Sequence, residues 1–165
     1  MTAPAVTGAR AIAADLGRIV GASHVKVGPA TLVPYQTGAP FGFSGVPSAM
    51  VRPGNADEVS RVLRWAKERR IPVVPRGAGT SLAAGAVPAR GGIVLALTRM
   101  DRIVSIDLTA VVEPGVTTQT LACVVPEHGL HYPPDRGSQR VSTVGGDVAT
   151  SIGGLHGLKY GNSGG

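Results

Sequence analysis

The sequence predicts a domain that mixes helices and strands, built from short elements. Apolar residues recur at helical spacing over 9–20 and 56–70, whereas 92–97, 102–106 and 110–113 are short apolar runs typical of strands. The 24 glycines and 13 prolines make up more than a fifth of the 165 residues, so turns are frequent. Apolar residues contribute 43% of the chain, which is enough for a hydrophobic core.

The N-terminal part contains one predicted helix and then an irregular stretch. Residues 9–20 have apolar positions on one helical face, so a short amphipathic helix is expected there. Residues 21–50 are rich in glycine, proline and serine and show no clear period. An irregular connector with short extended pieces is expected for this stretch.

The strongest helix prediction is 56–70. Asn55 is suited to cap its N-terminus, and Glu58 completes a capping box. Pro72 ends it, and a short buried strand follows at 73–74. The basic run at its C-terminal end suits a solvated helix terminus, where cations interact favourably with the helix dipole. One apolar stripe is expected to face the core and consists of Val59, Val62, Leu63 and Ala66.

The next elements are strands and a further helix. Residues 92–97 form one predicted strand, and 102–106 with 110–113 form a candidate hairpin. Its turn, 107–109, contains no glycine or asparagine, which is unfavourable chemistry for a two-residue hairpin loop. A helix is predicted over 117–125, capped by Thr117 or Thr118 and ended by Pro126 and Gly129.

Residues 76–81, with the sequence RGAGTS, are the most informative for function. They follow an apolar run that ends in a strand. Glycine accepts positive φ, so successive N–H groups can converge on one anion, and Arg76 adds a charge with planar donors. Leu82 stands where a dinucleotide fingerprint needs its third glycine, and no P-loop ending is present. A phosphate or pyrophosphate cradle and a plain glycine-rich turn are equally supported by this segment alone.

Composition narrows the classes of partner. The net charge of +6 and the pI of about 10.2 would suit a polyanion. The cations are scattered, however, and aromatic residues are only 4% of the chain, so stacking platforms for nucleic acid are lacking. No nucleic-acid partner is therefore expected. A basic nucleic-acid-binding protein is kept only as the alternative that the high pI suggests.

The reactive residues are few. Cys123 is the single cysteine and lies among apolar residues, so a buried, inert thiol is expected. The four histidines lack metal-binding spacing, and no acid–base pair follows from the spacing of the carboxylates, so neither a metal site nor a catalytic residue is predicted. No run of 18 apolar residues and no signal peptide is found, which predicts a cytoplasmic protein without a membrane span.

Several motifs occur in a fixed order along the chain. They are 51–53, 56–70, 71–82, 91–95, 112–116, 132–135, 143–146 and 153–161. An ordered set is far more specific than a single motif. This set resembles the PCMH-type FAD-binding domain of the vanillyl-alcohol oxidase and p-cresol methylhydroxylase superfamily, in particular the D-lactate dehydrogenase and glycolate oxidase FAD subunit.

The resemblance implies an α+β fold with two small β-sheets flanked by helices. It divides the chain into an N-terminal helix and connector, 1–47, and a partial FAD-binding domain, 48–165. In the family, a further strand and a substrate-binding cap domain follow the last motif, so the resemblance implies a C-terminally truncated chain.

The resemblance also implies a set of FAD-binding residues. Relatives with covalently attached flavin carry histidine where Thr80 stands, so non-covalent FAD is expected. The residues implied to hold the pyrophosphate are Arg76, Gly77, Ala78, Gly79, Thr80 and Ser81, with Gly85 alongside. Those implied to lie along the flavin and its ribityl chain are Pro134, Asp135, Ser138, Thr143, Gly145, Gly146, Gly153 and Gly154.

The function implied is the FAD-binding portion of a flavin-dependent oxidoreductase that acts on a D-2-hydroxyacid of the lactate or glycolate type. One alternative is a non-catalytic remnant. Another is half of a split flavoenzyme that needs a separate chain carrying the cap domain. An uncovered strand edge would also permit self-association.

Overall fold

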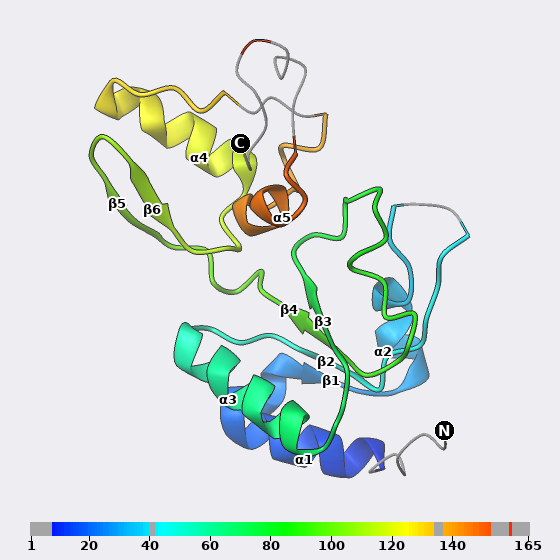
Figure 1. The fold of residues 1–165 in the computed structure, drawn as a ribbon. Helices are drawn as coiled ribbons and strands as arrows, with labels where there is room; N and C mark the ends of the chain where they lie inside the picture. The colour runs from blue at the N-terminus through cyan, green and yellow to red at the C-terminus, as the bar shows by residue number, and fades with distance from the viewer. Residues whose placement is uncertain (1–7, 40–41, 134–136, 153–158, 160–165) are drawn as a thin grey trace.

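The computed structural model describes residues 8–39, 42–133, 137–152 and 159. It contains two small sheets with helices around them, so the expected α+β fold is confirmed (Figure 1). The four-stranded lobe holds one sheet with α1, α2 and α3, and the hairpin lobe holds the second sheet with α4 and α5 (Figure 1).

The larger sheet has the strand order β1-β2-β4-β3. Strands β2 and β3 are each parallel to β4, and β1 is antiparallel to β2. Every residue of β2 and β4 is buried, as expected for inner strands of a sheet covered on both faces. The strands are β1 (Val25–Lys26), β2 (Ala49–Val51), β3 (Val73–Arg76) and β4 (Ile93–Ala96).

Helices α1 (Ala9–Val20) and α3 (Ala56–Glu68) cover one face of this sheet (Figure 1). Buried side chains of α1 lie one turn apart along the helix and pack in one cluster with Val51 and Ile93. The opposite face carries Met50 and Val94 against α2 (Pro29–Leu32). Alternate strand residues thus fill two cores, one on each side of the sheet.

Helix α3 confirms the prediction for 56–70, with two differences. The Asn55 side chain accepts a hydrogen bond from the Glu58 N–H at 2.9 Å, but the Glu58 carboxylate accepts from the Gly54 N–H, one residue before the capping-box position. The prediction that Leu63 is buried was wrong, because Trp65 takes that place in the core and Leu63 is 44% exposed.

The connector 21–50 is more regular than expected. Besides β1, α2 and the start of β2, it holds two 3₁₀ turns, Ala22–His24 and Val33–Tyr35. Pro29 occupies the first turn of α2, where its missing N–H costs nothing. Strand β1 exists through its pairing with β2, which local sequence does not reveal.

Strand β3 is longer than the predicted 73–74 and lies at the sheet edge. The expectation that it is buried was wrong, because only one side of it pairs with a neighbour and its residues are mostly half-buried. Pro75 is tolerated there, since an edge strand does not need every N–H for pairing.

The hairpin lobe begins with strands β5 (Ile103–Ile106) and β6 (Ala110–Val112), which pair as predicted. The unfavourable turn is stabilised by Asp107, whose carboxylate accepts hydrogen bonds from the backbone N–H and the hydroxyl of Thr109. The inner face of the hairpin packs on a core that includes Val116 and Leu121. A carboxylate thus supplies what glycine or asparagine usually provides in a short turn.

Helix α4 (Thr118–Val124) is capped by Thr117, in agreement with the sequence, and a 3₁₀ turn (Val125–His128) follows it. The prediction of a buried Cys123 was wrong: the thiol is exposed. The buried face of α4 holds Thr118 and Leu121, three residues apart, which directs Cys123 to the opposite side. Helix α5 (Val144–Ala149) follows Thr143 and was not predicted.

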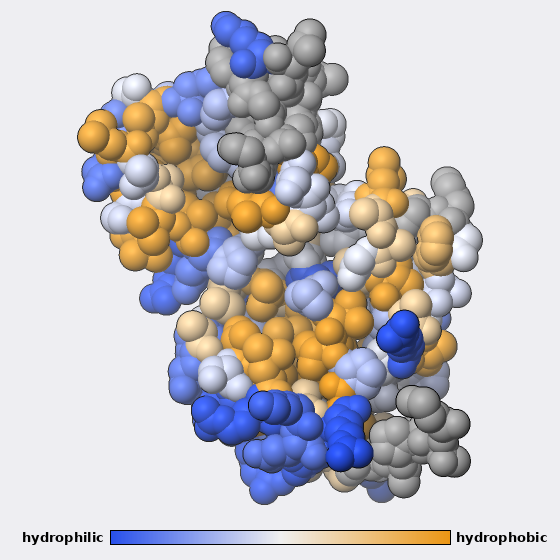
Figure 2. Space-filling model, in the orientation of Figure 1, coloured by the Kyte–Doolittle hydropathy of each residue, from blue (hydrophilic) through white to orange (hydrophobic). Residues whose placement is uncertain are grey.

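The surface is divided by polarity. Figure 2 shows hydrophilic residues gathered over α1 and α3, at the bottom, and apolar residues gathered over the β5–β6 hairpin, at the upper left. The outward-facing apolar side chains of the hairpin are Val104, Leu108 and Val111, of which Leu108 is 90% exposed. None of the described helices is long and apolar enough to cross a membrane.

The packing of α1 gives a stability prediction with a matched control. Leu16→Ala removes a fully buried side chain and should lower the free energy of unfolding by about 2–5 kcal/mol. Leu63→Ala, on the exposed side of α3, should change it by no more than about 0.5 kcal/mol. Chemical denaturation followed by circular dichroism measures both, and equal losses would contradict this packing.

A second prediction concerns Asp15, which joins α1 to α3. Its carboxylate accepts from the Trp65 indole N–H at 3.0 Å, and this bond, with the charges of Arg18 and Arg69, lowers the pKa of Asp15 below 3.8. The contribution of the ionised carboxylate is complete above the unfolded pKa and is lost as the pH falls through the lower folded value. Because Trp65 is the single tryptophan, its emission should change with a midpoint below pH 3.8. Asp15→Asn should abolish that step, and a step that persists would exclude Asp15 as its cause.

Candidate functional site

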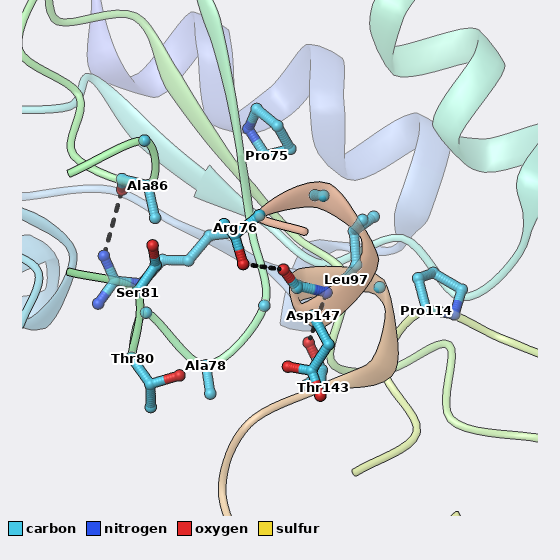
Figure 3. Close-up of a pocket in the computed structure, with 17 residues that line it drawn as sticks. Pro75, Arg76, Ala78, Thr80, Ser81, Ala86, Leu97, Pro114, Thr143 and Asp147 are labelled. Carbon is cyan, nitrogen blue, oxygen red and sulfur yellow. Dashed lines mark hydrogen bonds between the residues drawn. The ribbon is translucent and has the colours of Figure 1, made fainter. Parts of the chain in front are cut away.

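A cavity of about 330 Å³ lies where the two lobes meet (Figure 3). One wall is the end of β3 and the loop after it, residues 75–81, with 85–86. The other wall is helix α5 and its cap, and Leu97 and Pro114 complete the lining. The volume is within the range of small-molecule sites.

The structure brings ten of the predicted site residues together in this cavity. Ser138 does not line it, and its carbonyl accepts hydrogen bonds from the N–H groups of Val141 and Ser142 in a turn. Pro134, Asp135, Gly153 and Gly154 lie outside the described residues. The ten that line the cavity are Arg76, Gly77, Ala78, Gly79, Thr80, Ser81, Gly85, Thr143, Gly145 and Gly146.

The loop 77–81, here called the glycine loop, offers unused backbone donors. The parallel pairing of β3 ends where the Leu97 N–H donates to the Arg76 carbonyl at 2.9 Å. Beyond that bond, none of the five N–H groups of the glycine loop donates to another group in the part of the chain that the structure describes. Buried or half-buried N–H groups are normally paired, so this run is suited to a ligand with acceptor oxygens.

The Arg76 side chain lies behind the glycine loop (Figure 3). Its guanidinium donates to the carbonyl oxygens of Thr37 at 2.8 Å, Pro34 at 3.2 Å and Ala86 at 3.3 Å. The sequence led us to expect donors aimed at an anion, and here they are aimed at carbonyl groups. Burial lowers the pKa of Arg76, but an arginine stays charged at neutral pH.

Glycines allow two close contacts around the cavity. A Cβ at Gly77 would lie 2.2 Å from the Thr143 hydroxyl oxygen on the opposite wall, and a Cβ at Gly145 would lie 2.5 Å from the Pro114 Cβ within the hairpin lobe. Gly79 has φ of +78°, a conformation that favours glycine. Part of the glycine content that the sequence associated with a ligand therefore serves the junction between the lobes.

Helix α5 forms the second wall, and its presence is new relative to the sequence prediction. The Thr143 hydroxyl accepts from the Gly146 N–H at 3.3 Å, so Thr143 caps the helix. Gly145 and Gly146 lower helix propensity and hid this element from a reading of periodicity. The sequence does contain one indication of this helix, a threonine directly before Val144, in a position suited to capping.

Sequence reasoning also missed a buried polar cluster beside the cavity. Asp147, on α5, is 1% exposed and accepts from the Thr118 hydroxyl at 2.7 Å. That hydroxyl also lies 2.9 Å from the Ser142 hydroxyl oxygen. The cluster joins α5 to α4, and no local pattern indicates it because 29 residues separate Thr118 from Asp147.

The described part of the cavity is suited to holding an anion and lacks groups that would transform one. Besides the backbone donors, the described lining contains one cation, the half-buried Arg76, and one carboxylate, Asp147. Within the described ranges, no group of three or more His, Cys, Asp and Glu residues is placed to bind a metal ion. Such a site provides binding and leaves reactivity to its ligand.

Comparison with known proteins gives consistent results. A family described as an FAD binding domain matches residues 47–165. The chain is 47% identical over 122 residues to glycolate oxidase subunit GlcD of Bacillus subtilis and 45% identical over 115 residues to D-lactate dehydrogenase of Archaeoglobus fulgidus. These alignments cover 72% and 68% of this chain but 26% of each relative, so the chain spans about a quarter of their length.

The fold is also similar to that of solved structures. The structure of p-cresol methylhydroxylase with substrate bound superposes with a TM-score of 0.72 at 25% identity. The match covers 90% of this chain and 30% of that chain.

Two glycine substitutions test the geometry of the cavity. Gly145→Ala would gain helix propensity, but its Cβ would meet the Pro114 side chain and carbonyl, so we expect a net loss of about 1–3 kcal/mol in the free energy of unfolding. Gly85→Ala is the control, because no atom lies within 4 Å of its added Cβ. Urea denaturation of both variants measures the difference, and a Gly145→Ala protein as stable as the control would refute the close contact.

Proposed function

Because the chain belongs to the FAD binding domain family, we propose that its glycine loop holds the pyrophosphate of FAD in a flavin-dependent oxidoreductase. The family match confirms the resemblance drawn from the ordered motifs, and FAD is the cofactor of this family. The observation that carries the proposal is the run of five N–H groups without partners among the described residues, all in a loop that lines the cavity.

The chemistry of the loop fits a pyrophosphate. Phosphate oxygens accept several hydrogen bonds each, and successive backbone N–H groups in a glycine-rich loop form a concave donor surface for them. The Gly79 conformation helps to form that surface, and the uncompensated charge of Arg76 makes the potential there more positive. Backbone donors pay no side-chain entropy when they bind.

The remaining predicted residues are assigned roles within the same proposal. Gly85, Thr143, Gly145 and Gly146 line the cavity beside the loop and are proposed to lie along the cofactor. Pro134, Asp135, Ser138, Gly153 and Gly154 are proposed to lie on the flavin side. Thr80 also lines the cavity and has no imidazole for covalent attachment, so we propose that FAD is bound non-covalently.

We propose a D-2-hydroxyacid of the lactate or glycolate type as the substrate. Support comes from the similarity to a glycolate oxidase subunit and to a D-lactate dehydrogenase. When bound, FAD would supply the hydride-transfer chemistry for oxidation of such a substrate. The part assigned to the described residues is to hold the cofactor and to bring the two lobes together around it.

A partner chain is a second element of the proposal. The outward face of the β5–β6 hairpin exposes three apolar side chains, a surface suited to cover by protein. A separate polypeptide carrying a substrate-binding cap, or a second copy of this chain, is proposed to supply that cover.

The test of the proposed function is direct. The purified chain should show flavin absorbance after incubation with FAD, and denaturation should release all of the flavin if attachment is non-covalent. Ala78→Asp places a negative charge in the cavity and should weaken FAD binding more than about tenfold, because two like charges about 4 Å apart repel by roughly 4 kcal/mol near a protein surface.

Ala83→Asp is the matched control for this substitution. Ala83 is exposed two residues after the glycine loop and does not line the cavity. The Ala83→Asp variant should therefore bind FAD about as tightly as the unmodified chain. Fluorescence titration measures both variants. Failure of the unmodified chain to bind FAD, or equal losses in the two variants, would refute the assignment of the loop.

A further inference from the structure

The Arg76 guanidinium joins three separate parts of the chain behind the glycine loop. It donates to Pro34 and Thr37, about 40 residues earlier in the sequence, and to Ala86 beyond the loop. Its ring contact with Tyr35, 5.9 Å from the ring centroid, lies on the same earlier segment. One planar group thus holds the connector and both ends of the loop in a fixed relation. Figure 3 shows the bond to Ala86.

The same guanidinium is pressed against the loop itself. A Cβ built on Gly79 would lie 2.3 Å from Nη2 and 2.5 Å from Cζ of Arg76. The guanidinium therefore fills the space where a side chain at position 79 would stand. Gly79 must be a glycine on two counts, its positive φ and this contact.

The bonding of Arg76 differs from that of a cation that grips a ligand. Three of its interactions end on neutral carbonyl oxygens, and no carboxylate of the described residues lies within 4.0 Å of it. Three of its five N–H donors are used by the protein, two on Nη1 and one on Nη2. The other two belong to Nε and Nη2, the nitrogens that lie against Gly79, where an added Cβ would be 2.9 Å from Nε and 2.3 Å from Nη2.

From this geometry we infer that Arg76 is a positioning residue, which sets the conformation of the glycine loop for the FAD pyrophosphate without touching the phosphates. The inference builds on the proposed function and changes the role of one residue within it. The planar fork is essential to this role, because several donors in fixed directions reach three carbonyl groups at once. A lysine ammonium has the same charge but cannot reproduce that arrangement.

The experiment compares charge with shape. Arg76→Lys keeps the charge, Arg76→Met removes it, and Arg90→Met removes an equal charge from an exposed site that does not line the cavity. Affinity for FAD is measured by flavin fluorescence, at a temperature where circular dichroism shows every variant folded. Both Arg76 variants should lose affinity by about tenfold to hundredfold, as expected for hydrogen bonds to a charged group, and Arg90→Met should stay within about twofold.

A double-mutant cycle tests whether Arg76 and Gly79 act through the contact between them. Gly79→Ala displaces the guanidinium, so its loss of affinity should overlap with that of Arg76→Met. The double variant should lose less than the product of the two single losses, by about threefold or more. A full product would show that the two residues act independently, and restoration of affinity by Arg76→Lys would assign Arg76 to direct charge contact; either result would overturn the inference.

The amide NMR spectrum of the FAD-free chain separates this inference from the proposed function. Arg76→Lys should shift the amide signals of the glycine loop and of residues 35–37 in the absence of FAD, whereas Arg90→Met should leave them in place. If the unmodified chain binds no FAD, the proposed function fails, and these shifts still report on Arg76. Unchanged loop signals in Arg76→Lys would overturn the positioning role even if FAD binds.

Discussion

The site depends on where the parallel pairing of β3 with β4 ends. Strand β4 is buried along its whole length and pairs on both sides, so its position is fixed by two neighbours and two cores. Strand β3 lies at the edge and follows β4 only as far as the bond between Leu97 and Arg76. The chain then leaves the sheet, and the N–H groups that a longer strand would use for pairing become available to a ligand. The last residue that the sheet holds, Arg76, is thus followed directly by the first residue of the glycine loop.

The second constraint is the close packing around α5. Gly77 meets Thr143 across the two lobes, and Gly145 meets Pro114 within the hairpin lobe, at distances that no side chain at the glycine positions would allow. Asp147, also on α5, accepts a buried hydrogen bond from Thr118 of α4. A buried polar bond is costly to break, because each group would be left desolvated without a partner. Close contacts at two glycines and this hydrogen bond therefore define the position of the second wall.

Much of the fold follows from local pattern, and the exceptions have physical causes. The amphipathic helices α1 and α3, the hairpin and the Thr117 cap are encoded within a few residues, by periodicity and capping chemistry. Helix α5 contains two glycines, so tertiary packing rather than propensity explains it. Leu63 and Trp65 are separated by two positions on α3, and which one enters the core depends on the shape of α1 opposite.

The site shows the same division. The donor loop could be located from RGAGTS, because glycine content and strand context are local. The role of Arg76 could not, since its acceptors Pro34 and Thr37 lie about 40 residues away and are backbone atoms without a sequence signature. Asp147 was missed for a similar reason, as its partner Thr118 belongs to another helix.

A site built from backbone donors separates recognition from reactivity. The backbone N–H groups of the glycine loop are the same for almost any residue, so in the proposed function the specificity for a pyrophosphate would come from loop shape. Loop shape in turn depends on what stands behind it, here a guanidinium engaged with three carbonyl groups. The side chains that line the described cavity determine its shape and supply one cation, and they include no acid–base pair. In the proposed function, this wall holds the cofactor, and the reactivity comes from the cofactor rather than from the described side chains of the wall.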